Sequence, residues 1–305
     1  MKSLALLLLF FVISLCYSCY YITNINEEPV PTFTEIKGIR YTEVRRSFQN
    51  GLSFNEQGFQ LEPEWNIYFN ADDSVKIFSP EKKHYMTYRI FHSHKALFQF
   101  AREWFRVKHV SKDSILLQVM ALESRVVNED QSTIYMKLYS DEYIKNVLKI
   151  DAAKLKAPSS EDSLFIKYRA IQANSNLDSA FAARNPVVLN SRSRITRVEK
   201  IKPTLDPYLG HVNRSEEYLY PEYRINIDKA YQNFQYSFSV VVDHNGKMHF
   251  KDFLVAVEPE FLETKTKVAK GIIDIYLRNT LDIKPGNTLG FLHSSLINLH
   301  VIGKK

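Results

Sequence analysis

Histidine and acidic side chains gather between residues 72 and 109 of the sequence. His92 and His94 are two residues apart, so in a strand both imidazoles would lie on one face. Metal binding needs three or more converging donors, and the conceivable further donors are Asp72, Asp73, His84 and His109. His92 and His94 are therefore candidate metal ligands, and the same set would suit a hydrolase that uses Asp, Glu or His. In the alternative interpretation they are solvated residues beside turns, and no metal is bound.

Two pairs of neighbouring carboxylates are the other candidates for acid–base chemistry. Asp141 and Glu142, and Glu161 and Asp162, are adjacent in sequence rather than spaced to face each other across a cleft. Both pairs fit the start of a helix, where negative charge favours the helix dipole. The sequence also lacks a G-x-S-x-G elbow, a Walker loop, a G-x-G-x-x-G loop and an H-E-x-x-H motif. We therefore expect no catalytic residue and no cofactor. Hydrolysis ranks below the two other functions that are weighed at the end of this subsection.

The two cysteines lie together near the N-terminus, at positions 16 and 19. Lys2 gives a positive start, residues 4–15 are apolar apart from Ser14, and Ser18 precedes Cys19. This segment resembles the lipobox of bacterial lipoproteins, which implies removal of residues 1–18 as a signal peptide and lipidation of Cys19. The alternative is an uncleaved anchor that reaches Ile22.

This arrangement restricts both the chemistry and the location of the mature part. With no cysteine after position 19, a disulfide framework, thiol catalysis and cysteine-bound zinc are excluded there. The resemblance places the chain in the cell envelope, periplasmic or surface-exposed, with membrane lipid as its first partner. The net charge of +6 attracts anions, and without a DNA or RNA motif we expect lipid head groups and no nucleic acid. Residues 192–202 form the richest basic cluster.

The elements that would position these residues begin after a polar segment. Residues 19–37 have an acidic pair and two prolines, so we interpret them as a lipidated tether. Residues 38–150 show mainly period-two patterns broken by turn signals, which predict a β-rich domain: a sandwich or open barrel with short helices. Within it, residues 95–103 contain helix formers and predict a short helix. Residues 151–215 are interpreted as a helical and irregular connector, in which Leu164, Tyr168 and Ile171 would form the apolar face of a helix.

The clearest elements lie at the C-terminal end. Residues 238–242 and 247–254 flank an Asn-Gly turn and predict a hairpin, a helix begins near Pro259, and residues 295–302 alternate as a final strand. The order is strand, strand, helix, strand. Together with FSVVVDHNGK and KPGNTLG, it resembles the C-terminal domain of TonB-type energy transducers over residues 216–305. The resemblance implies a periplasmic α+β module that meets a protein partner by strand pairing or surface docking.

These observations favour one function and leave two alternatives. The leading hypothesis is a membrane-anchored periplasmic lipoprotein that acts as a non-enzymatic scaffold and meets an envelope protein through residues 216–305. The first alternative is a carrier of a small hydrophobic ligand in a lipocalin-like barrel, because the strands are rich in aromatic residues. The second is the hydrolase described above. The fold class expected in all three cases is α+β.

Overall fold

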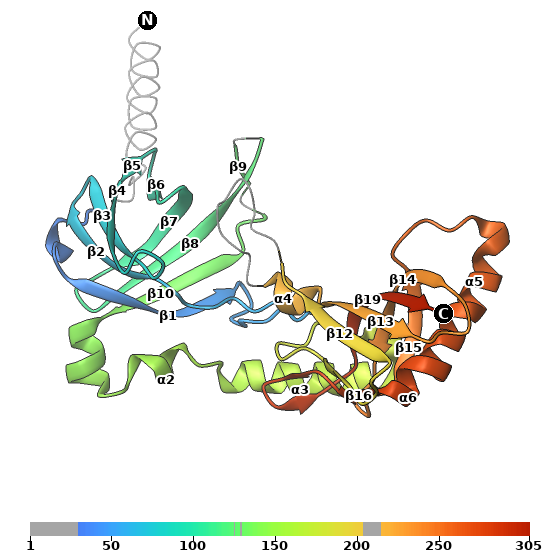
Figure 1. Ribbon diagram of the computed structural model, residues 1–305. Coiled ribbons are helices and arrows are strands. Elements are labelled where there is room, and N and C mark those ends of the chain that lie inside the picture. The colour runs from blue at the N-terminus through green and yellow to red at the C-terminus, as the bar shows by residue number, and fades with distance from the viewer. Residues whose placement is uncertain (1–29, 125, 129, 204–214) are drawn as a thin grey trace, which may run out of the picture. The chain divides into compact units, whose positions relative to one another are not determined.

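The computed structural model describes residues 30–124, 126–128, 130–203 and 215–305 (Figure 1). The described residues divide into two compact units, one formed by residues 30–44 and 64–151 and the other by residues 45–63 and 152–305. The predicted signal peptide, Cys19 and the first part of the predicted tether lie outside the described residues.

The N-terminal unit is built on one antiparallel sheet, which among the described residues has ten strands. Its strands follow the order β4-β3-β2-β1-β10-β8-β7-β6-β5, and β9 pairs with β8. Their bounds are β1 (Arg40–Phe48), β2 (Asn66–Ala71), β3 (Ser74–Ser79), β4 (His84–Arg89), β5 (Phe91–His92), β6 (Leu97–Phe100), β7 (Glu103–Val110), β8 (Ser114–Glu123), β9 (Val126–Asn128) and β10 (Ile134–Ser140).

The sheet curls into a nearly closed barrel because of how its edges are connected. β4 and β5 stand at opposite ends of the strand order, yet Ile90 alone separates them in sequence. The Cα atoms of Arg89, which ends β4, and Phe91, which begins β5, can be at most about 8 Å apart, so the two edges of the sheet must come close together. The prediction of a β-rich domain is thus confirmed, and of the two architectures expected, sandwich or open barrel, the structure has the barrel.

Aromatic and aliphatic side chains fill the interior of this barrel. The ring of Phe33 stacks on Phe69 with centroids 4.1 Å apart and meets Phe98 edge-on at 5.3 Å. Phe100 and Phe105 stack at 4.4 Å. Phe33 precedes a 3-10 turn, η1 (Thr34–Ile36), so the last residues of the predicted tether are part of the barrel core. Phe33 and Ile36 are large apolar side chains whose burial stabilises the fold, and each is only 1% exposed.

The predicted helix over residues 95–103 is wrong. The segment instead contains β6, a turn and the start of β7. Ala101 and Arg102 both adopt positive φ angles, 51° and 70°, which produces a tight hairpin without the glycine or asparagine that normally marks one. A short π-helical segment, η2 (Tyr143–Leu148), does follow Ser140 as the sequence predicts.

The C-terminal unit combines a five-stranded sheet with helices. The order of the main sheet is β12-β13-β19-β14-β15, while β11 pairs with β16 and β17 with β18. The bounds are α2 (Ala152–Lys156), α3 (Ser160–Ser175), η3 (Leu177–Ser179), β11 (Val188–Ser191), β12 (Thr196–Ile201), α4 (Glu216–Leu219), β13 (Glu222–Asp228), β14 (Phe234–Val242), β15 (Met248–Phe253), α5 (Pro259–Ile272), η4 (Ile273–Leu277), α6 (Arg278–Thr280), β16 (Leu281–Lys284), β17 (Asn287–Thr288), β18 (Phe291–Leu292) and β19 (Ser295–Lys304).

The predicted strand–strand–helix–strand module is present in this sheet. β14 and β15 form the expected hairpin, and β19 returns antiparallel to β14 after the helix. Ala269, Ile272, Ile273 and Leu277 pack from the helical side into the core, and Figure 1 shows α5 and α6 along one side of the sheet. β13 adds a parallel neighbour to β19, and β12, from the predicted connector, completes the other edge.

The helix predicted in the connector exists, but its buried face is not the one expected. In α3, Ile166, Ala170 and Ala173 are buried. Leu164, Tyr168 and Ile171 are exposed, by 57%, 70% and 58%. Both sets repeat at helical spacing, so the period identifies the helix without choosing between its two apolar sides.

Candidate functional site

The histidines singled out as metal ligands do not converge. His92 Nε2 lies 2.8 Å from the Lys95 carbonyl oxygen, and His94 Nδ1 lies 3.0 Å from the Ser93 hydroxyl, each in a local turn. His84 is likewise bound to the carbonyl of Lys82. Within the described ranges, no group of three His, Cys, Asp or Glu side chains is placed to hold a metal ion. His92 and His94 therefore lack the third donor that a metal site requires.

Asp72, the acidic candidate near these histidines, serves the local backbone instead. Its carboxylate accepts hydrogen bonds from the Phe33 N–H and from the Thr34 hydroxyl. The bond from Thr34 is the main cause that lowers the pKa of Asp72. Asp72 thus holds the segment before β1 against the β2–β3 turn.

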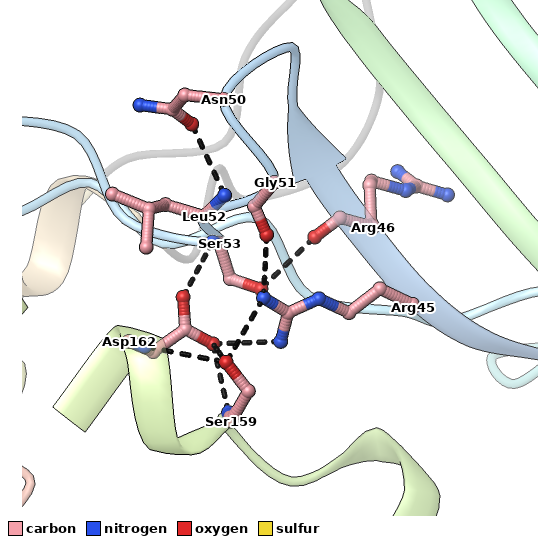
Figure 2. A network of polar contacts seen from close by, with 8 residues as sticks. All are labelled: Arg45, Arg46, Asn50, Gly51, Leu52, Ser53, Ser159 and Asp162. Carbon is pink, nitrogen blue, oxygen red and sulfur yellow. Dashed lines mark hydrogen bonds and ion pairs between the residues drawn. The ribbon is translucent and has the colours of Figure 1, made fainter.

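Asp162 is the centre of a polar network in the C-terminal unit (Figure 2). One carboxylate oxygen accepts the Ser53 N–H at 2.7 Å, and the other accepts Arg45 Nη1 at 2.6 Å and the Ser159 N–H at 2.8 Å. Ser159 caps α3 and forms a capping box with Asp162. The prediction that Glu161 and Asp162 mark a helix start is confirmed.

The electrostatics of Asp162 argue against a role as an acid. Its side chain is fully buried, and burial alone would raise its pKa. The hydrogen bonds from Arg45, Ser53 and Ser159 outweigh that effect and lower the pKa below its ordinary value. A carboxylate with a lowered pKa is ionised at pH 7, and its hydrogen bonds tie residues 45–53 to the start of α3.

A serine, a histidine and a glutamate lie side by side on the face of the main sheet opposite α5. Ser237 on β14 and His300 on β19 are directly opposed, and Ser237 Oγ is 2.8 Å from His300 Nδ1. The other ring nitrogen, Nε2, is 3.6 Å from a carboxylate oxygen of Glu222 on β13. Such a chain of hydroxyl, imidazole and carboxylate is the arrangement that activates a serine nucleophile. Sequence reasoning missed it because it requires knowing that β13, β19 and β14 are neighbours.

The backbone of β14 does not supply an oxyanion hole beside Ser237. β14 lies between β15 and β19, so the N–H groups near Ser237 point along the sheet rather than towards the face that carries its hydroxyl. An oxyanion formed on that face would therefore receive no hydrogen bond from this strand's backbone. Stabilising that charge is commonly the largest single contribution to such catalysis.

A pocket of about 300 Å³ with a mixed polar and apolar lining lies where the β15–α5 connection passes the start of β14. Half of its lining residues are aromatic or aliphatic: Phe234, Tyr236, Phe253, Val255 and Val257. The other half are polar: Gln232, Asn233, Gln235, Ser237 and Lys265. Phe261 and Leu262, in the first turn of α5, follow within a few residues and are 51% and 46% exposed. We call the pocket together with Phe261 and Leu262 the apolar corner. In Figure 1 the connection rises away from the sheet before the chain enters α5.

The first part of α5 contributes nothing to the core. Its buried residues are Ala269 and Ile272, in the last turn, so the helix extends over residues 259–268 without burying a side chain. Isolated exposed apolar residues are common, but here two of them follow in sequence a pocket with aromatic and aliphatic residues in its wall, which makes this region a candidate interaction surface.

The comparisons with known proteins add no family to this description: no protein-family model matches the sequence, and no curated protein matches it. None of the helices in the described part of the chain is long and apolar enough to cross a bilayer.

Proposed function

We propose that this protein is a membrane-anchored lipoprotein of the cell envelope that acts as an interaction scaffold, with Cys19 as its lipidation site. The lipobox-like segment before Cys19 and the basic charge of the chain support the anchor. Several acyl chains would hold the protein stably, where a single chain would be marginal. The TonB-like order of the C-terminal elements supports a periplasmic protein partner for residues 216–305.

The apolar corner is the observation that carries the scaffold role. Aromatic residues in well-packed pockets dominate the binding energy of protein interfaces, and the corner offers both a pocket and projecting anchors. Phe261 and Leu262 would lie against the partner's surface, while a partner side chain would enter the space between Phe253 and Val255. Lys265, which also lines the pocket, adds a cation at its rim and favours an acidic group on the partner.

Site-specific photo-crosslinking tests this role in cells. A photoreactive residue at position 262 should capture one envelope protein, and Val255→Ser in the pocket wall should reduce that product several-fold. Val188→Ser is the matched control, because it makes the same substitution at another exposed valine. Val188 lies in β11, is 46% exposed and is outside the apolar corner. Equal crosslinking in both variants, or no captured envelope protein at all, would contradict the scaffold role.

The packing inside the barrel favours this proposal over the carrier hypothesis. A carrier needs an apolar cavity of ligand size. Here the stacks of Phe33 on Phe69 and of Phe100 on Phe105 occupy the interior.

The Ser237–His300–Glu222 chain supports hydrolysis as a second candidate. An activated serine reacts with fluorophosphonate probes whatever its natural substrate, so labelling can be tested without knowing that substrate. Hydrolysis predicts labelling of the intact protein that Ser237→Ala abolishes and that Ser239→Ala leaves in place. If the protein is not labelled, the Ser237–His300 hydrogen bond and the His300–Glu222 ion pair stabilise the pairing of the strands instead.

A further inference from the structure

A second pocket in the C-terminal unit is lined by cations and has no role in the scaffold proposal. It measures about 310 Å³ and lies where the β14–β15 turn meets α6 and β16. Arg192, Lys247 and Arg278 all line it, and Asp282 is the one carboxylate among its lining residues. The excess of positive charge favours an anion in this pocket.

The three cations differ in how far they are already engaged. Within the described part of the chain, the Lys247 ammonium has no hydrogen-bond or ion-pair partner, although Lys247 N–H donates to Asp243. Arg192 donates one N–H, from Nη2, to the carbonyl oxygen of Arg278 at 2.9 Å, which leaves other donors of its guanidinium for a ligand. Arg278 pairs with Asp274 at 2.7 Å and is half-exposed.

The backbone around the pocket fixes the positions of Arg192 and Lys247. The Arg192 N–H donates to the Thr280 carbonyl at 2.8 Å, which fixes the residue next to the end of α6. Gly246, beside Lys247, has a φ of +82°, and a Cβ there would lie 2.8 Å from the Ile283 carbonyl oxygen. The hairpin turn is therefore held close against β16, and the base of the Lys247 side chain is held with it.

We propose that this pocket binds a phosphate group, with Arg192 and Lys247 as its principal ligands. A guanidinium presents paired N–H donors that match two phosphate oxygens, and an ammonium adds a compact charge beside it. Arg278 contributes less because Asp274 neutralises it, and Asp282 opposes binding by like-charge repulsion. The phosphate is carried either by a free anion or by the head group of an anionic lipid.

Titration of the full-length protein in detergent with inorganic phosphate, followed by calorimetry, tests the site. We expect binding that Lys247→Gln weakens at least about fivefold. Lys200→Gln, which removes the same charge from an exposed position on β12, should change the affinity less than about twofold. Asp282→Asn should strengthen binding by about twofold or more, a gain that a misfolded variant would not produce.

Two short-chain lipids, below their micelle concentrations, distinguish the sources of the phosphate. If the natural ligand is a lipid head group, phosphatidylglycerol binds more tightly than phosphate and loses affinity in Lys247→Gln, while zwitterionic phosphatidylcholine binds weakly. If the ligand is a free anion, phosphate binds at least as tightly as either lipid. Absence of phosphate binding, equal losses in Lys247→Gln and Lys200→Gln, or no gain in Asp282→Asn would each overturn the proposal.

Discussion

His293 is the buried titratable residue with the clearest consequence for stability. Its ring stacks on Phe181 with centroids 3.7 Å apart, and Nε2 lies 3.0 Å from the Thr288 hydroxyl. Burial lowers the pKa of His293 to about 4, and the charge of Arg169 adds to the effect. The imidazole is therefore neutral in the folded protein at pH 7, and no sequence pattern indicated it.

This depressed pKa predicts acid sensitivity of the C-terminal unit. The unfolded chain binds a proton at His293 near pH 6.5, whereas the folded protein does so only near pH 4. The stability that the neutral ring contributes is thus complete above about pH 6.5 and is lost as the pH falls towards 4. Urea unfolding at pH 7.5 and pH 4.5 should show a smaller loss for His293→Gln than for wild type. His84→Gln, at an exposed position, should keep the wild-type loss; equal losses in all three proteins would contradict the argument.

Asp162 differs from His293 in that the folded protein requires its charged form, and a substitution that removes the charge should therefore destabilise α3. Asp162→Asn keeps the shape but weakens the bonds from Arg45, Ser53 and Ser159, and it removes the negative charge that pairs with the Arg45 guanidinium. We expect a loss of about 2–4 kcal/mol in the free energy of opening of α3. Hydrogen exchange of the amides in its first turns measures this. Ser160→Ala, one residue from the cap and exposed, should change it by less than about 0.5 kcal/mol.

Secondary structure was predictable where a local chemical signal decided it. The Asn245-Gly246 turn identified the β14–β15 hairpin, and Pro259 marked the start of α5. The turn at Ala101 and Arg102 carries no such signal, so residues 95–103 were mistaken for a helix. In α3 the helix was found but its buried side was not, because that choice depends on distant partners such as Phe54 and Phe181.

η1 and the residue before it show how an apparent tether becomes part of a domain. Phe33 lies inside the barrel, so Phe33→Ala should destabilise the N-terminal unit by about 3–5 kcal/mol. Both tryptophans of the chain, Trp65 and Trp104, are in this unit, so their fluorescence reports its unfolding. Phe91→Ala, at a site 52% exposed, should cost less than about 1 kcal/mol. A similar cost for both variants would place Phe33 outside the cooperative core.

The division of the whole molecule could be anticipated only in part. A β-rich unit that ends near residue 150 followed from the change in sequence pattern. That residues 45–63 belong with residues 152–305 did not, because it depends on contacts more than a hundred positions apart. Examples are Arg45 with Asp162 and the Gln60 N–H with the Tyr218 hydroxyl. The Ser237–His300 pair and the phosphate pocket are likewise products of strand order, which local patterns do not determine.

The attachment of the whole protein to a membrane through Cys19 is the central claim. Intact-mass spectrometry of membrane-extracted protein tests it most directly, with Cys19→Ala and Cys16→Ala as paired variants. Wild type and Cys16→Ala should both lack residues 1–18 and carry the added mass of acyl chains, while Cys19→Ala should show neither change. A full-length, unacylated wild-type chain would contradict the account and would identify residues 4–22 as an uncleaved anchor.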